Sequence, residues 1–320
     1  MDNLTHSLVG ALLGQMGLKR KTGLAMPTLI IAANIPDIDA VATLLGGQEH
    51  LALRRGITHG PIAMFILPLL LWAIMLWFEN WQAKRGKRPE KRLAVHKGWL
   101  LALAYIGCLS HPLFDWFNSY GIRLLEPFSS QWFYGDTLFI IDIWLWVALI
   151  AGVWVSLRRE RKNAPSWRAP AFISFAAICA YIFANGLITG RAEQQMADAV
   201  QQKHDLVPAL VVANPVPVQF WKREMLWRDE SHYGQGSFTA FTDVSVDDFV
   251  GAHYMSVVDK KAFEANVVSG SPLLFWSRMP VARIQNEGIQ RTLKISDQRF
   301  ADPLVGDRFT MSFPIGAESK

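Results

Sequence analysis

Four long apolar runs dominate the first 190 residues. Pro61 to Phe78 and Ala169 to Thr189 contain no charged residue, Gly98 to Phe117 contains only His111 and Asp115, and Thr137 to Leu157 contains only Asp142. At about 1.5 Å per residue, a helix over each run is long enough to cross a hydrocarbon core of roughly 30 Å. The pattern therefore predicts four transmembrane helices.

Two shorter apolar segments precede these runs. Leu4 to Leu18 and Leu24 to Ile35 flank the basic triplet Lys19, Arg20 and Lys21. They are short for independent spans, so we expect either two short helices or a re-entrant hairpin packed against the bundle. In both cases the two outer ends of the pair lie on the same side.

The pattern changes after residue 190. The stretch "RAEQQMADAVQQ" predicts a short amphipathic helix, and "GQGSFTAFTDVSV" and "QRTLKISDQRF" show the alternation and turn residues of strands. We therefore predict an α-helical polytopic membrane domain over residues 1–190 and a mostly β soluble domain over residues 191–320.

Composition and charge fit this division. The chain is 51% hydrophobic and 18% charged, with a mean hydropathy of +0.16 and a net charge of +5. Its basic residues gather between apolar runs, in Glu79 to Lys97 and Arg158 to Arg168, which is typical of membrane topology rather than of direct nucleic-acid binding. The positive-inside rule makes these loops cytoplasmic. It places Asn34 to Gly60, Asn118 to Asp136 and the β domain on the outer side, the periplasm of a Gram-negative cell.

This topology brings scattered polar residues toward one face of the membrane. His111 and Asp115 are spaced i, i+4 and share a helix face, and Asp37 and Asp39 flank one residue in "NIPDIDAV". The set at the outer ends of their segments is His6, Asp37, Asp39, His59, His111, Asp115, Asp136 and Asp142. Asp136 is a candidate helix cap and Asp142 a candidate partner of a basic residue. The alternative for each position is an interfacial residue that faces headgroups and water.

Imidazole and carboxylate together suit zinc, manganese or iron better than calcium or magnesium. Cys108 and Cys179 both lie in apolar runs, so thiolate ligands are not expected. Such an ion activates water for hydrolysis. The same ligands are also compatible with a structural site or a transport pathway, and ligand chemistry alone leaves these open.

Four motifs in order, "DNLTHSLVGALLG", "NIPDIDA", "RRGITHGP" and "LSHPLFDWFNSYG", resemble the YdjM/YbcI-type membrane-bound metal-dependent hydrolases, also described as LexA-binding, inner-membrane-associated hydrolases. The resemblance implies a metal-dependent hydrolase of the inner membrane. It places His6, Asp37, Asp39, His59, His111 and Asp115 at the characteristic polar positions. It also implies LexA as a cytoplasmic partner, which would have to contact the basic loop Glu79 to Lys97 or its neighbour.

The sequence thus leads to one main hypothesis. A divalent transition metal, zinc foremost, is held by some of those six residues and activates water against a lipid or envelope-derived ester, phosphoester or amide. Asp37, Asp39 and Arg55 are the catalytic candidates, with Arg54 or Arg55 stabilising an anionic transition state. The competing hypothesis is a non-catalytic membrane protein: a metal or proton relay, a sensor, or an interaction scaffold that binds a partner or anionic lipid through its basic loops.

Overall fold

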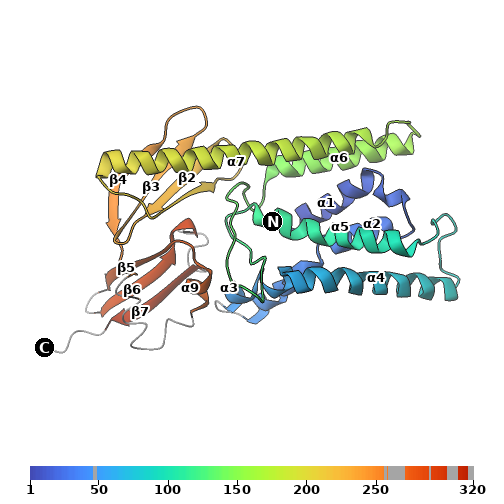
Figure 1. The fold of residues 1–320 in the computed structure, drawn as a ribbon, viewed down its shortest axis with the longest axis horizontal. Coiled ribbons are helices and arrows are strands. Elements are labelled where there is room, and N and C mark those ends of the chain that lie inside the picture. The colour runs from blue at the N-terminus through green and yellow to red at the C-terminus, as the bar shows by residue number, and fades with distance from the viewer. Residues whose placement is uncertain (46–48, 256–257, 259–270, 288–289, 301–308, 316–320) are drawn as a thin grey trace. The chain divides into compact units, whose positions relative to one another are not determined.

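The fold is seen in a computed structural model that describes residues 1–320 except 46–48, 256–257, 259–270, 288–289, 301–308 and 316–320 (Figure 1). The chain divides into two compact units. One comprises Met1–Ala40 and Arg55–Gly186, and the other Val41–Arg54 and Leu187–Lys320. The predicted domain boundary at residue 190 falls inside a helix that contributes to both units.

The chain is helical up to His204, and this part forms the first unit except for Val41–Arg54 and the residues after Gly186, which belong to the second unit. It begins with two short helices, α1 (Asn3–Gln15) and α2 (Ala25–Ala32), joined through the 3-10 turn η1 (Leu18–Arg20) and followed by the 3-10 segment η2 (Ile35–Leu45). After α3 (Glu49–Leu53) and η3 (Ile57–His59) come α4 (Pro61–Lys84), α5 (Lys97–Trp116), α6 (Ile143–Arg161) and α7 (Ala169–His204). Two short helices, one of the two alternatives expected before the long runs, are thus present.

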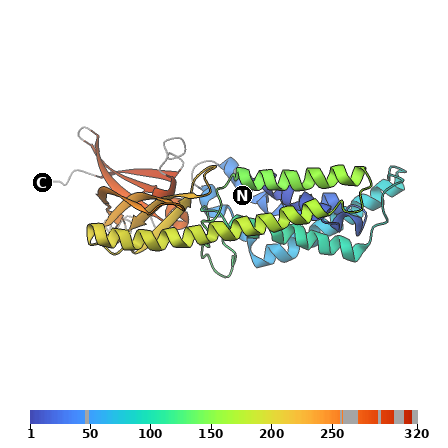
Figure 2. The same cartoon turned by 90° about the horizontal axis from the view of Figure 1, so that it is seen from above.

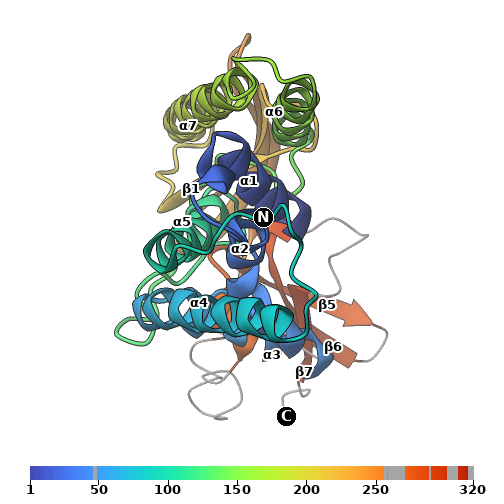
Figure 3. The same ribbon diagram turned by 90° about the vertical axis from the view of Figure 1, so that its right-hand side faces the viewer.

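Close packing around α2 organises this unit, and Figure 3 shows its helices nearly end-on. Helix α2 contacts both α1 and α5. Gly10 of α1 and Gly107 of α5 lie against the backbone of α2, where an added Cβ would come within 2.7 Å and 2.8 Å of the Leu29 carbonyl oxygen. Small residues allow such close approach between helices. Since α2 leads directly into η2, this packing fixes the start of the segment that carries Asp37 and Asp39.

Among the residues that the structure describes, two helices are long and apolar enough to cross a membrane, α4 and α7. A third span is possible if α2 and Ile35–Leu44, bent by 44°, are counted as one broken span. Large apolar side chains on α4, among them Phe65, Leu70 and Trp77, are 52–64% exposed, as a lipid-facing helix requires. Membrane association therefore rests on at least two helices.

The prediction of four spans is not supported for the other two runs. The run Thr137 to Leu157 becomes helical only at Ile143, where the side chain of Asp142 caps α6, and that helix ends in Arg158, Arg159, Glu160 and Arg161. Only 15 apolar positions remain, fewer than a span needs. The run Gly98 to Phe117 does form α5, but buried His111 and Asp115 lower its apolar character.

The second unit is built on antiparallel sheets, as the strand pattern predicts. Strands β1 (Leu210–Pro215), β2 (Lys222–Arg228), β3 (His232–Thr239) and β4 (Ser245–Ala252) form one sheet in the order β1-β2-β3-β4. Strands β5 (Pro280–Glu287), β6 (Gln290–Asp297) and β7 (Thr310–Ile315) form a second, accompanied by α9 (Pro272–Trp276) and η4 (Gln298–Phe300).

The stretch "RAEQQMADAVQQ" is not a separate short helix, because it continues the 36-residue α7, which Figure 2 shows as one helix. Ala192, Met196 and Val200 recur every four residues along this part of α7, and they are buried against Met225, Trp227 and Phe238 of the first sheet. This apolar face of α7 therefore packs against the core of the first sheet, which explains why the helix continues beyond its apolar run Ala169 to Thr189.

Candidate metal centre

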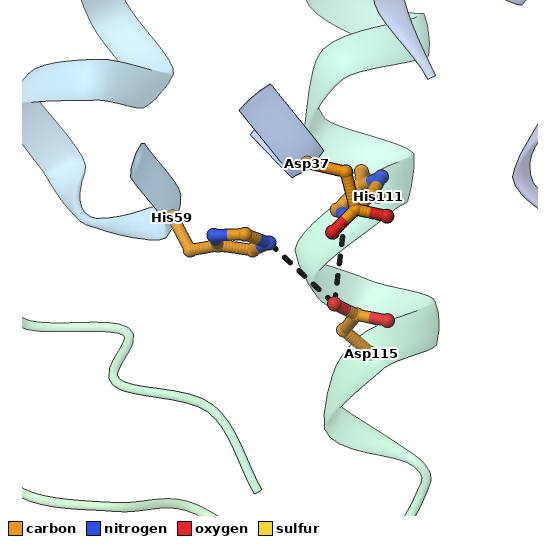
Figure 4. Close-up of side chains that lie close together, drawn as sticks. All are labelled: Asp37, His59, His111 and Asp115. Carbon is orange, nitrogen blue, oxygen red and sulfur yellow. Dashed lines mark ion pairs between the residues drawn. The ribbon is translucent and has the colours of Figure 1, made fainter. Parts of the chain in front are cut away.

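Four side chains from three separate stretches of sequence converge inside the helical unit (Figure 4). They are Asp37, His59, His111 and Asp115, and all four are buried. His111 and Asp115 project from successive turns of α5 and are fully buried. The i, i+4 spacing that suggested a shared face does bring them together, with 3.4 Å between His111 Nε2 and Asp115 Oδ2.

The other two members come from the segments flanking α3. Asp37 lies in η2, three residues after Asn34, with its Oδ1 3.8 Å from His111 Nε2. His59 ends η3, with its Nε2 3.5 Å from Asp115 Oδ2. Gly60 follows, and a Cβ there would come within 1.8 Å of the Glu126 carbonyl oxygen, so only glycine fits this close approach. The chain is thereby held where His59 reaches the cluster.

The geometry of the cluster suits a cation. One ligand atom from each of the four residues lies within 4.8 Å of the others. His59 Nε2 and His111 Nε2 are buried and have no hydrogen-bond partner in the described part of the chain. Buried polar atoms without partners are costly, and an ion among them would remove that cost. Two imidazole nitrogens and two carboxylates are a donor set for a transition metal.

Each histidine is oriented by a second contact on its other ring nitrogen. His111 Nδ1 lies 2.7 Å from the carbonyl oxygen of Ala33, at the end of α2, so that Nδ1 donates and Nε2 keeps its lone pair toward the cluster. His59 Nδ1 lies 3.4 Å from Asp39 Oδ2. The same Asp39 oxygen accepts from the Thr58 hydroxyl at 2.8 Å and from the Arg55 backbone N–H at 2.7 Å. Asp39 is therefore well placed to orient His59.

The neighbouring carboxylates change the pKa of His59. Burial lowers the pKa of His59, but the carboxylates of Asp115 and Asp39 outweigh burial and hold the pKa above its ordinary value of 6.5. A metal ion must displace this proton in order to bind the imidazole. Metal binding is therefore expected to weaken as the pH falls.

Arg55 lies directly behind Asp115. Its guanidinium is nearly fully buried, with Nε 3.0 Å from Asp115 Oδ2 and Nη2 3.2 Å from Oδ1. Nη1 donates to Asn118 Oδ1 at 2.9 Å and to the Gly121 carbonyl oxygen at 3.3 Å, and the group stacks on Tyr120. A guanidinium engaged in this way fixes a carboxylate rather than reaching out to an anion.

His6 also lies beside the cluster. Its ring stacks on His111, with 3.7 Å between the centroids, and its Nε2 lies 3.3 Å from Asp115 Oδ1. The amino group of Met1 donates to the same oxygen. Asp115 Oδ1 thus faces His6, Met1 and Arg55 Nη2, while Oδ2 faces His59, His111 and Arg55 Nε.

All six residues named as ligand candidates therefore meet in one region, together with Arg55. Asp37, His59, His111 and Asp115 form the cluster itself, whereas Asp39 and His6 contact its members from outside it. Asp142, and not Asp136, is the helix cap: its Oδ1 accepts from Leu145 N at 2.9 Å, and its Oδ2 from the Tyr181 hydroxyl at 2.9 Å.

Sequence reasoning missed three supporting groups. Thr58, Asn118 and the Ala33 carbonyl each hold a residue of the site in place. Thr58 and Asn118 lie inside motifs already singled out, so their positions next to His59 and three residues after Asp115 were a usable signal. A backbone carbonyl offers no sequence signal.

Comparison with known proteins agrees with this picture. Residues 1–192 match the model of the YdjM inner membrane protein family, and this range contains every residue of the cluster. The chain is also 22% identical over 235 residues to a Bacillus subtilis (strain 168) protein whose name is "Uncharacterized protein YfhP". That match covers 69% of this chain and 64% of the relative, so the chain spans less than two thirds of the relative's length. No solved structure is significantly similar to the chain. Because the family match covers more than half of its residues, this chain belongs to the YdjM inner membrane protein family.

Proposed function

We propose that this protein is a metal-dependent hydrolase of the bacterial inner membrane, acting on a lipid or envelope-derived ester, phosphoester or amide. The observation that supports it is the buried convergence of Asp37, His59, His111 and Asp115, which each bring one possible ligand atom within 4.8 Å of the others. Zinc is the ion that this ligand set fits best, with manganese and iron as alternatives.

Each residue near the cluster has a distinct proposed role. A bound transition metal would polarise the substrate's oxygen and lower the pKa of a nearby water. His59, His111 and Asp115 hold the site, with Asp39 orienting His59 and Arg55 fixing Asp115. Asp37 takes the proton of the attacking water, because Arg55 engages Asp115 and Asp37 is the other carboxylate of the cluster. This assigns Asp39 and Arg55 as positioning residues.

The lengths of the helices support chemistry at the outer leaflet. His59 immediately precedes α4, whose other end is Lys84, and 24 residues of helix rise about 36 Å. Asp115 likewise ends α5, which begins at Lys97. The site and the basic loop thus lie at opposite ends of both helices, separated by about the thickness of a hydrocarbon core. If the basic loop is cytoplasmic, the site opens on the periplasmic side. LexA binding stays a prediction from resemblance and would have to use that loop.

Metal analysis of the full-length protein tests the proposal. We expect about one transition-metal ion per chain in detergent-purified protein, and its loss in His111→Ala. Asp37→Asn keeps the shape of the side chain, so a folded variant that retains metal but no longer hydrolyses phospholipid or peptidoglycan-derived substrates would support the proposed role. His232→Ala, a half-exposed histidine of the sheet unit, is the matched control. Wild-type protein without metal would contradict the proposal.

Burial also favours a second candidate, a structural metal site. The four side chains are 0–7% exposed, and closed sites of this kind often supply folding energy. The two candidates differ in what chelation does. A structural ion predicts that metal removal unfolds the helical unit, whereas the hydrolase predicts a folded apoprotein that recovers activity when metal is returned.

A further inference from the structure

One end of the helical unit carries a dense group of cations, which we call the basic end. It comprises the segments Leu18 to Gly23, Lys84 to Lys97 and Arg158 to Arg168, with 15 Lys and Arg residues in all. Only Glu79, Glu90 and Glu160 lie in or directly beside these segments. The segments are in contact: Lys19 and Arg20 pair with Glu160, and Gly23 N donates to the Ala94 carbonyl at 3.0 Å.

Tryptophans accompany these cations. Arg85 lies over Trp81, Lys21 over Trp99, Arg158 over Trp154, and Arg20 and Arg168 over Trp167, with 4.5–5.5 Å between the charged group and the ring centroid. Amphipathic tryptophan rings gather at the headgroup level of membranes. The basic end is thus built like the part of a membrane protein that meets lipid headgroups.

A surface pocket lies within this end. It has a volume of about 360 Å³ and is lined by Trp154, Leu157, Arg158, Arg161 and Lys162. These residues follow the i, i+4, i+7 spacing of one helix face at the C-terminal end of α6. The pocket therefore combines three cationic groups with an apolar wall.

The three cations of the pocket are available to a ligand. Arg158, Arg161 and Lys162 are exposed and form no ion pair with any residue that the structure describes. The neighbouring carboxylate, Glu160, is already engaged by Lys19 and Arg20. Capping of α6 does not use these side chains either, because the backbone N–H groups of Lys162 and Asn163 satisfy its last carbonyls.

An apolar track leads from the pocket along α6. Val147, Ile150 and Trp154 continue the same helix face toward the middle of the helix, and they are 56%, 47% and 58% exposed. An anionic headgroup and an attached acyl chain would thus meet surfaces of matching chemistry.

We propose that this pocket binds the phosphodiester headgroup of an anionic phospholipid, whose acyl chains lie along the exposed face of α6. Juxtamembrane clusters of Lys and Arg attract anionic lipid, and arginine is well suited to phosphate oxygens. The pocket lies outside the metal centre, and this inference does not rest on the proposed hydrolysis.

Lipid binding by full-length protein tests the proposal. The protein is purified in a neutral detergent and incubated with equal amounts of phosphatidylglycerol and phosphatidylcholine, and bound lipids are counted by native mass spectrometry. The wild type should retain phosphatidylglycerol preferentially. Arg161→Gln combined with Lys162→Gln should reduce this preference roughly tenfold, because each lost cation weakens attraction to anionic lipid.

The matched control removes the same charges from the same end. Arg85 and Lys87 are exposed and do not line the pocket, so Arg85→Gln combined with Lys87→Gln should leave the preference within about twofold of the wild type. Equal loss in both double variants would show diffuse attraction without a site and overturn the proposal. So would a wild type without lipid preference, or displacement of the lipid by inorganic phosphate at equal concentration.

Discussion

Asp115 shows how one fully buried carboxylate can serve two sets of neighbours. Its Oδ1 faces His6 and its Oδ2 faces His59 and His111, while the Arg55 guanidinium contacts both oxygens. Burying a charge of this kind is expensive unless cationic and hydrogen-bonding groups surround it. Arg55 supplies a permanent positive charge beside this carboxylate. The electrostatics of Asp115 therefore depend on Arg55.

The position of Asp39 leads to a prediction for a single residue. If it orients His59 rather than binding the ion, Asp39→Asn should retain full metal stoichiometry at saturation but weaken metal affinity by about 10- to 100-fold. Competition with a chromophoric chelator measures the affinity. Asp243→Asn, an exposed carboxylate of the sheet unit, should leave it unchanged. Loss of stoichiometric metal in Asp39→Asn would instead make Asp39 a ligand.

Sequence alone predicted which residues meet, but not what each one does. The i, i+4 spacing was sufficient to predict that His111 and Asp115 meet, because this contact depends on helix geometry only. The sequence does not distinguish the roles of Asp37 and Asp39. In the fold, Asp37 lies near His111, whereas Asp39 contacts Thr58 and His59. Arg55 likewise differs from Arg54 through its left-handed backbone, with a φ of 52°, and its contact with Asn118. These distinctions arise from long-range contacts that no local pattern contains.

Asp297 gives a pH-dependent prediction in the sheet unit. Burial raises its pKa, but the adjacent Arg299 guanidinium and the Ser277 hydroxyl outweigh burial and hold the pKa below its ordinary value of 3.8. A lowered folded-state pKa contributes stability above about pH 4, and this stability is lost as the pH falls through the folded-state pKa. Thermal unfolding of the full chain should therefore shift to lower temperature on acidification below pH 4. Asp297→Asn should flatten that dependence, and an unchanged slope would exclude Asp297 as its source.

At the scale of elements, the close approach of α2 to α5 is the feature that sets the site. Gly107 leaves no room for a side chain, since a Cβ would meet Ala32 Cβ at 2.7 Å and the Leu29 carbonyl at 2.8 Å. The next residue along α2, Ala33, holds His111 through its carbonyl. Helix packing and ligand orientation thus share the same few residues.

Gly107→Ala tests that coupling. Forced overpacking should cost about 1–3 kcal/mol of unfolding free energy, and the displaced Ala33 carbonyl should also lower metal affinity. Gly186→Ala is the matched control, because that helical glycine has no atom within 4 Å of an added Cβ and should gain about 0.5–1 kcal/mol. Detergent thermal unfolding followed by circular dichroism, with metal titration alongside, measures both effects. Equal behaviour of the two variants would contradict the packing argument.

The elements themselves were only partly predictable. The length of the apolar runs correctly identified α4 and α7 as candidate spans. It wrongly predicted that α5 and α6 also span the membrane, because the length of a run does not show where its helix starts. Asp142 starts α6 late, and four charged residues end it. The buried face of the last part of α7 was visible in its spacing. Its continuity with the apolar run before it was not, because Gly186 and Gly190 lie at the junction and the helix continues through both.

At the scale of the whole molecule, the distribution of charge along the chain makes a topological prediction. The basic segment before α7 should be cytoplasmic, and since α7 is long enough to span, the chain after Gly186 should emerge on the periplasmic side. The test uses single cysteines in a Cys108→Ala, Cys179→Ala background. Thr242→Cys lies in an exposed turn after β3, and Lys87→Cys lies in the exposed basic loop. A membrane-impermeant maleimide should label Thr242→Cys in cells with a permeabilised outer membrane, and label Lys87→Cys only after lysis. The reverse order would place the metal centre at the cytoplasmic face, where a water-soluble cytoplasmic substrate would replace the envelope substrate proposed above.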